Sequence, residues 1–184
     1  MDSRKLYASG DSWYRHLRAG SYNYIKPTKL LVKGVGLKTT VGLLGENTTF
    51  NGANCPGIIL EGLGDHTLEY VLGLLNSRLV TYYLRAVCPA KLNGYRRFNA
   101  NNLNAIPLRI INFIDPADKA RHDKMVQLVE SMLALHKHKA AAKTQADQEL
   151  YQRQIETTDR EIDALVYELY GLTPDEIATV ETAR

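Results

Sequence analysis

The strongest constraint on the fold is a stretch without helix breakers in the C-terminal part of the chain. Neither proline nor glycine occurs from residue 117 to residue 170. Asp115 and Pro116 are typical of a helix start, with a side-chain acceptor at the cap and proline at the first helical position. Gly171 is typical of a helix end, because glycine readily adopts the left-handed conformation found there. We therefore predict that long helices fill this stretch.

The apolar positions divide the stretch into two helices. In the first helix they recur at spacings of 3, 4 and 3, and in the second at 4-3-4-3-4. The positions are Met125, Leu128, Met132 and Leu135, followed by Tyr151, Ile155, Thr158, Ile162, Leu165 and Leu169. Thr144 can cap the second helix, and Thr173–Glu176 has the capping-box pattern of a last short helix. The pattern predicts an antiparallel hairpin. One continuous helix is the alternative, because residues 140–146 contain no strong breaker.

The part before residue 115 has mixed secondary-structure signals. Short aliphatic or β-branched runs between Gly- and Asn-rich turns predict strands, and one longer periodic run predicts a helix. The predicted strands are 29–33, 39–44, 57–60 and 106–111, the helix is Leu68–Tyr83, and one helical turn covers Asn99–Asn104. The predicted fold class is therefore α/β (α+β), with a small mixed sheet and packed helices followed by the long helical hairpin. The predicted boundaries are 1–114 for the mixed domain and 115–184 for the hairpin.

The net charge of +3 hides an uneven distribution along the 184 residues. Residues 1–110 hold 14 Lys and Arg against 6 Asp and Glu, a net of +8, whereas residues 111–184 hold 9 against 14, a net of −5. Such asymmetry indicates two parts with different partners, and a polyanion is the expected partner of the first part. No apolar run reaches the roughly 18 to 20 residues of a membrane span, and the polar first residues do not form a secretory signal. We expect a cytoplasmic protein without a membrane partner, with Cys55 and Cys88 as reduced thiols.

No motif in the chain supplies a complete active site. Gly34–Thr40 resembles a phosphate-binding loop but lacks the contiguous Gly-Lys-Ser/Thr, so it is interpreted as a glycine turn between two strands. His136 and His138 diverge by about 200° on a helix and cannot share a metal ion. His122 and Asp118 are four residues apart and are interpreted as a pair on a solvated helix face. We therefore expect no catalytic residue and no metal site.

The candidate binding surface is basic and rich in amides. Residues 91–102 contain three cations, four asparagines and two aromatic residues. Cations neutralise phosphates, while Arg and Asn can also bond to base edges. The candidate DNA-binding residues there are Lys91, Asn93, Tyr95, Arg96, Arg97, Asn99 and Asn101, joined by Lys29, Lys33 and Lys38 around the strands. Strand alternation places Lys29 and Lys33 on the same face, where both would meet a phosphate backbone. The alternative is an ordinary solvated loop.

The order of motifs along the chain resembles a known family. The motifs are the helix with Leu72–Ser77, the segment Phe98–Leu103, the run Ala105–Leu108, and the ending Ile162–Gly171. Together they resemble the TaqI-like C-terminal specificity domain of bacterial type II and IIG restriction–modification adenine-specific DNA methyltransferases. They are also similar to the target-recognition domains of type I specificity subunits. The resemblance runs from about Lys26 to the C-terminus, and its ending is its most specific part.

This resemblance implies a module that binds double-stranded DNA and does not catalyse. The expected partners are a methyltransferase domain or subunit and, in some such enzymes, a nuclease. No cofactor is expected in this chain, and S-adenosylmethionine is expected to bind to the catalytic domain. The chain is then the C-terminal piece of such an enzyme or a separate subunit, with the hairpin as a spacer and docking arm. Two alternatives remain at this stage. One is an assembly subunit that dimerises through the hairpin and binds no DNA, and the other is an enzyme with an unrecognised site.

Overall fold

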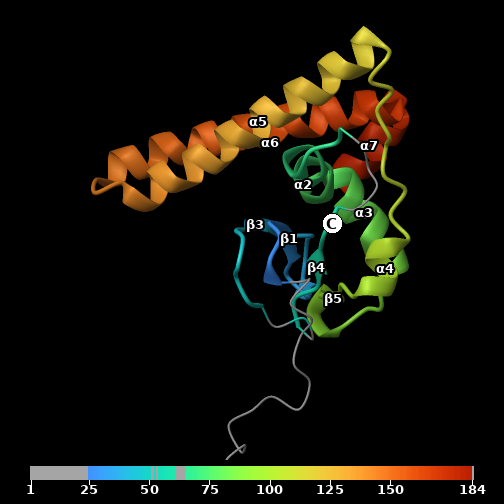
Figure 1. The fold of residues 1–184 in the computed structure, drawn as a ribbon, viewed down its shortest axis with the longest axis horizontal. Helices are drawn as coiled ribbons and strands as arrows, with labels where there is room; N and C mark the ends of the chain where they lie inside the picture. The colour runs from blue at the N-terminus through green and yellow to red at the C-terminus, as the bar shows by residue number, and fades with distance from the viewer. Residues whose placement is uncertain (1–24, 51, 53, 61–64, 184) are drawn as a thin grey trace, which may run out of the picture.

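The computed structural model describes residues 25–50, 52, 54–60 and 65–183. The long hairpin of α5, Pro116–Ala141, and α6, Gln145–Tyr170, crosses one end of the molecule, and its tip projects beyond the rest of the chain (Figure 1). Helices α2, Leu68–Asn76, and α3, Arg78–Val87, lie beneath the base of the hairpin, and the small sheets lie below them. The layers thus run from hairpin to short helices to sheets, which confirms the mixed fold class.

Two small sheets form from short strands. The first has the order β3-β1-β4, with β1 at Lys29–Val32, β3 at Val41–Leu44 and β4 at Gly57–Ile58. The second pairs β2 at Val35–Gly36 with β5 at Arg96–Arg97. Every pairing of the described strands is antiparallel, so the sheet that we expected to be mixed is antiparallel throughout these pairings. The link from β1 to β3 is far shorter than a parallel crossover requires.

The strand predicted at 106–111 is wrong, because this segment is irregular. Side chains from other elements bond to its backbone groups in place of a neighbouring strand. The Tyr70 hydroxyl donates to the Arg109 carbonyl over 2.8 Å, and the Tyr170 hydroxyl donates to the Pro107 carbonyl over 2.8 Å. The Ile111 N–H donates to Nε2 of His66 over 2.9 Å. Pro107 has no N–H to give to a sheet, which favours this arrangement.

The helix predicted over 68–83 is also corrected, because it breaks into two. Helix α2 covers Leu68–Asn76 and α3 covers Arg78–Val87. Ser77 between them is extended, with ψ of 158°. Its hydroxyl donates to the Leu74 carbonyl over 2.7 Å and accepts from the Val80 N–H over 3.3 Å. One serine therefore ends the first helix and caps the second.

Two residues of the Leu72–Ser77 motif join α2 to its neighbours. A Cβ on Gly73 would lie 2.4 Å from Sδ of Met125, so the glycine allows α2 and the hairpin to approach closely. Asn76 accepts a bond from the Val41 N–H over 2.9 Å and donates to the Val41 carbonyl over 3.1 Å. Because the amide satisfies both backbone groups of Val41, it attaches β3 to α2. The motif is therefore structural.

The hairpin is confirmed, and the capping residues lie where we predicted them. Helix α5 covers Pro116–Ala141, with the Asp115 side chain accepting from the Ala117 N–H. Helix α6 covers Gln145–Tyr170, begins at the Thr144 cap and ends at Gly171 with φ of 65°. Helix α7, Pro174–Thr182, has the full capping box. The remaining elements are the 3-10 turn η2 at Leu92–Gly94 and α4 at Ala100–Asn104, which Asn99 caps as expected.

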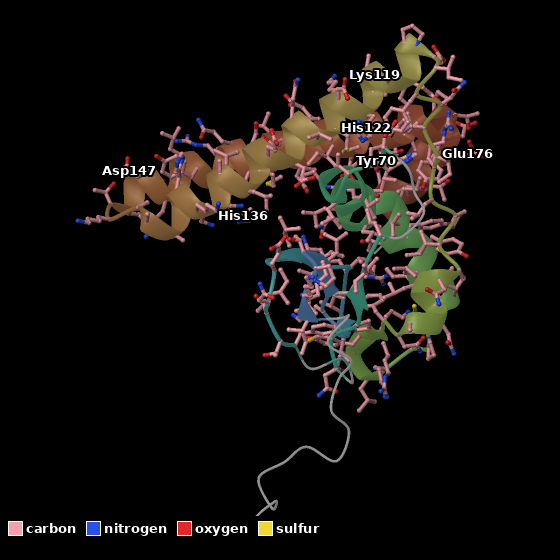
Figure 2. All side chains as sticks on the ribbon, viewed as in Figure 1. Tyr70, Lys119, His122, His136, Asp147 and Glu176 are labelled. Carbon is pink, nitrogen blue, oxygen red and sulfur yellow. The ribbon has the colours of Figure 1, made fainter. Side chains whose placement is uncertain are left out.

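Burial corrects the interpretation of His122 and Asp118 as a solvated pair. Both side chains are buried, and they bond to different partners. Asp118 accepts from Arg109 Nη2 over 2.9 Å, while His122 Nδ1 lies 3.1 Å from an oxygen of Asp123. Figure 2 shows Tyr70 beside His122 at the base of the hairpin, with ring centroids 5.1 Å apart. Helix α5 packs on α2 here, so the polar helix face meets a buried aromatic cluster.

One apolar core runs through all layers. It joins Leu30 of β1, Leu74 of α2, Met125 of α5 and Val166 of α6. The core therefore crosses residue 114, and the division at that residue remains a prediction. Both cysteines are free thiols, and burial raises the pKa of the Cys88 thiol. Among the described residues, no helix is both long and apolar enough to cross a membrane.

Candidate nucleic-acid interface

The pairing of β2 with β5 brings the two basic segments of the sequence together. Val35 lies opposite Arg97, and Gly36 lies opposite Arg96. The Phe98 N–H extends the pairing by donating to the Gly34 carbonyl over 2.8 Å. Residues about sixty positions apart in the sequence therefore form one surface.

Glycine makes this close packing possible. A Cβ on Gly34 would lie 1.9 Å from the Asn54 carbonyl oxygen, and one on Gly36 would lie 2.8 Å from the Lys38 carbonyl oxygen. Neither position can hold a side chain without moving backbone. The glycines of residues 34–40 thus allow neighbouring backbone segments to approach closely. This agrees with the interpretation of the segment as a turn rather than a phosphate-binding loop.

A groove of about 550 Å³ opens beside this pairing. Its polar lining side chains are Asn54, Lys91, Arg97 and Asn99, and its aromatic ones are Phe50 and Phe98. We call this the basic groove. Lys91 and Arg97 are exposed, and Phe98 beneath them is buried. The groove thus combines exposed cations and amides with a buried aromatic floor at Phe98.

Lys29 is a correction to the predicted binding residues. Its side chain is fully buried, and Nζ donates to the carbonyls of Ile25 over 2.9 Å and Pro27 over 2.7 Å. Strand alternation placed it beside Lys33, but the chain before β1 folds over its ammonium group. Lys29 therefore stabilises the N-terminal end of β1 and is not available to a phosphate.

The other predicted residues fall into two groups. Most are exposed: Lys33, Lys38, Lys91, Asn93, Tyr95, Arg97 and Asn101. Arg96 and Asn99 also have structural bonds. Arg96 Nε donates to the Arg85 carbonyl over 3.0 Å, and Asn99 Oδ1 accepts from the Asn102 N–H over 3.0 Å. Arg96 thus braces the surface against α3. Asn54, which sequence reasoning missed, reaches the groove only because the segment before β4 packs on Gly34.

The stretch of sequence that contains β5 carries only cations, and two of them, Arg78 and Arg109, pair with carboxylates of the hairpin. From residue 70 to residue 114 the sequence has six Lys and Arg residues and no Asp or Glu. Within the described part of the chain, Lys33, Lys91 and Arg97 form no ion pair, and the acids that do form ion pairs all lie in residues 115–184. An anionic ligand at the basic groove would therefore meet unpaired cations.

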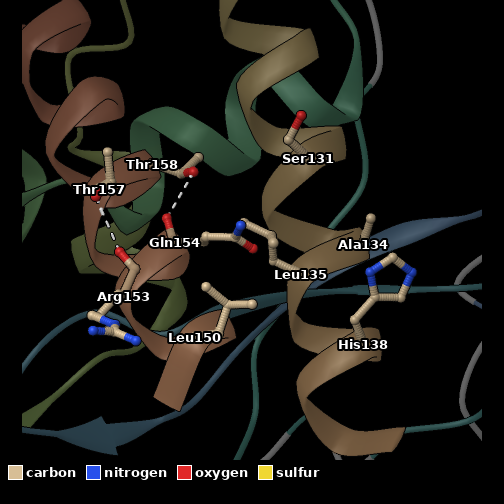
Figure 3. Close-up of a pocket in the computed structure, with 9 residues that line it drawn as sticks. All are labelled: Ser131, Ala134, Leu135, His138, Leu150, Arg153, Gln154, Thr157 and Thr158. Atoms are coloured by element: carbon tan, nitrogen blue, oxygen red, sulfur yellow. Dashed lines mark hydrogen bonds between the residues drawn. The ribbon is translucent and has the colours of Figure 1, made fainter. Parts of the chain in front are cut away.

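A second groove of about 550 Å³ lies along the outer half of the hairpin (Figure 3). The hydroxyls of Thr157 and Thr158 donate to carbonyls of their own helix, at Arg153 and Gln154, each over 3.0 Å. The ring of His138 lies against Tyr151, with centroids 5.6 Å apart. The two threonine hydroxyls of this groove therefore bond within their own helix, and the His138 ring packs across the hairpin. In the described ranges, no group of three or more His, Cys, Asp or Glu could hold a metal ion.

The fold and the groove define a mixed α/β module with a cationic surface and a projecting helical arm. Comparison with protein families matches residues 4–108 to the TaqI-like C-terminal specificity domain. The match covers more than half of the chain, and the chain belongs to this family. No curated protein matches the chain.

The family match confirms the resemblance seen in the sequence but covers a different range. It includes the Leu72–Ser77 helix and the Phe98–Leu103 segment, together with the whole basic groove. It stops before the hairpin, so the ending Ile162–Gly171, which we expected to be the most specific part, lies outside it. The membership therefore rests on the part of the chain that forms the groove.

Proposed function

We propose that this chain is the target-recognition module of a bacterial restriction–modification adenine-specific DNA methyltransferase. It binds double-stranded DNA in the cytoplasm and supplies sequence specificity rather than catalysis. The methyl donor, S-adenosylmethionine, is bound by the methyltransferase domain or subunit that partners this chain. Membership of a specificity-domain family supports this proposal.

The observation that carries the proposal is the union of two basic segments at the β2–β5 pairing. Lys91 and Arg97 line the groove beside this pairing, Lys33 directly precedes Gly34 of its lining, and all three side chains are exposed. Lysine and arginine supply the affinity for phosphates, and asparagine can pair with adenine. Asn54 and Asn99 in the groove wall provide such amides.

A titration of the chain with random-sequence duplex DNA at low and at physiological salt tests the proposal. We expect affinity to fall steeply with salt, because bound cations release counterions from DNA. The triple variant Lys33→Ala, Lys91→Ala and Arg97→Ala should bind more weakly, and its salt slope should be smaller by about 0.9 for each phosphate that is no longer neutralised.

The matched control removes three exposed lysines of the hairpin, Lys124, Lys137 and Lys143. This variant has the same net charge as the groove variant and should keep wild-type affinity. Equal decreases in affinity for the two variants would show that net charge alone drives binding. Binding that is absent at low salt would overturn the proposal.

A further inference from the structure

The segment beside the basic groove forms a stiff, two-stranded projection. Ala90 pairs with Arg96 in an antiparallel bridge, and the Lys91 N–H donates to the Tyr95 carbonyl over 2.8 Å. The chain reverses through η2, where Asn93 and Gly94 have φ of 59° and 78°. These are the two residue types that tolerate left-handed backbone best. We call residues 90–96 the tip ribbon.

The tip ribbon is braced on both edges. On one edge Arg96 pairs with Gly36 of β2, and on the other its Nε donates to the Arg85 carbonyl over 3.0 Å. Leu37 packs near the turn, because a Cβ on Gly94 would lie 3.8 Å from its Cδ2. The turn is therefore presented by a fixed scaffold and needs little ordering before it binds.

Leu92 lies at the end of this ribbon with its side chain 88% exposed. Its immediate neighbours Lys91 and Asn93 are exposed as well, and Arg97 follows at the base of the ribbon. The structure thus holds an aliphatic group out in solvent next to Lys91, on the ribbon that leads to Arg97. Burial would stabilise such a group, yet nothing in the described fold covers it.

We propose that Leu92 contacts a thymine methyl group on the floor of the major groove. This inference rests on the proposed DNA-binding function and adds a base-reading residue to it. The major groove, about 12 Å wide, admits a two-stranded ribbon, and the thymine C5-methyl is the apolar feature that it displays. With the tip ribbon on the floor of the major groove, Lys91 and Arg97, which line the basic groove beside the ribbon, can contact phosphates, so one element combines positioning with reading.

The test begins with selection of bound sites from a randomised duplex library by the full chain. The selected duplex is then synthesised with each thymine replaced in turn by deoxyuridine, which lacks only the methyl group. We expect one replacement to weaken wild-type binding about fourfold, the value for one buried methyl contact. Leu92→Ala should weaken binding to the thymine duplex by a similar factor and bind both duplexes alike.

Because Leu92 is almost wholly exposed, Leu92→Ala should leave the thermal unfolding curve unchanged, and Leu92→Met should keep the discrimination. Leu150→Ala, at an exposed leucine of the hairpin, is the matched control and should also keep it. Full discrimination in Leu92→Ala, or none in the wild-type chain, would overturn the inference and leave DNA binding intact. A rise in 2-aminopurine fluorescence that depends on Leu92 would show insertion between bases and overturn it as well. If no duplex binds at any salt, the proposed function itself fails.

Discussion

At the base of the hairpin, arginine side chains lie against carboxylates, whereas the cations of the basic groove face solvent. Arg109 Nη2 lies 2.9 Å from Asp118, Arg121 Nε lies 2.7 Å from Glu168, and Arg78 Nε lies 3.1 Å from Asp163. The same residue types therefore have different roles in the two regions.

The surroundings of the carboxylates show what the paired charges do. Asp118 accepts from the Asn112 N–H over 3.1 Å, and this bond, with Arg109 and Arg121 nearby, holds the pKa of its carboxyl below the usual range. Asp163 accepts from the N–H of Arg78, the first residue of α3, over 2.8 Å. The carboxylates of the hairpin thus hold the segment that contains Asn112 and the first residue of α3 in place. Charges on the hairpin side therefore stabilise the fold, while charges at the groove are left available to a ligand.

The largest effect on stability is expected where the hairpin meets α2. Met125 is fully buried and faces Gly73. Met125→Ala should lower the free energy of unfolding by about 2 to 5 kcal/mol, because it leaves a cavity in a packed core. Urea denaturation measures this decrease. Leu135→Ala, on the half-buried outer part of the same helix, is the control and should cost less.

An intermediate effect is expected at Asp163, and it depends on pH. Burial raises the pKa of this carboxyl to about 6, although the Arg78 N–H opposes the shift. The folded state therefore binds a proton more tightly than the unfolded state, and this group's contribution to stability falls as pH rises from about 4 to about 6. The decline should be on the order of 1 to 3 kcal/mol.

The variant Asp163→Asn isolates this contribution, because its amide does not titrate and can still accept from the Arg78 N–H. We expect the stability difference between wild type and Asp163→Asn to change over this pH window and then to level off. Carboxyls such as Asp118 titrate in both proteins and cancel in the difference. A difference that is flat from pH 4 to pH 7 would show that the bonds with Arg78 offset the effect of burial on the pKa.

The smallest effect on stability is expected at the basic groove. The triple variant Lys33→Ala, Lys91→Ala and Arg97→Ala should change the free energy of unfolding by no more than about 0.5 kcal/mol, since exposed, unpaired side chains contribute little. The same variant is expected to have the largest effect on DNA binding. A strong destabilisation would contradict this prediction, because it would show that these cations stabilise the fold.

Local signals in the sequence predicted much of the helical part. Asp115, Thr144, Gly171 and Thr173 all act at helix ends, because capping depends on residues a few positions apart. The break of the predicted 68–83 helix at Ser77 was missed, because it depends in part on a contact between residues far apart in the sequence. The new helix start gains a bond from Asp163, 85 residues away, which no local pattern contains.

The candidate site was predicted in composition but not in shape. Residues 91–102 were identified by their cations and amides, yet the partner strand β2 has only two residues and therefore no periodicity to detect. The burial of Lys29 depends on two carbonyls of the preceding residues, Ile25 and Pro27, folding over its ammonium group. Close approaches of backbone, as at Gly34, decide which side chains meet in the groove.

The length of the hairpin determines how far its end lies from the packed part of the molecule. From Val129, the last residue of α5 that is buried, to Ala141 at its end, the helix continues for 12 residues. At 1.5 Å per residue this is about 18 Å of helix beyond its last buried residue. A tilt of about 10° where α5 rests on α2 would shift the far end by roughly 3 Å. The close contact of Met125 with Gly73 therefore helps to set where a protein held at the end of the hairpin would lie relative to the basic groove.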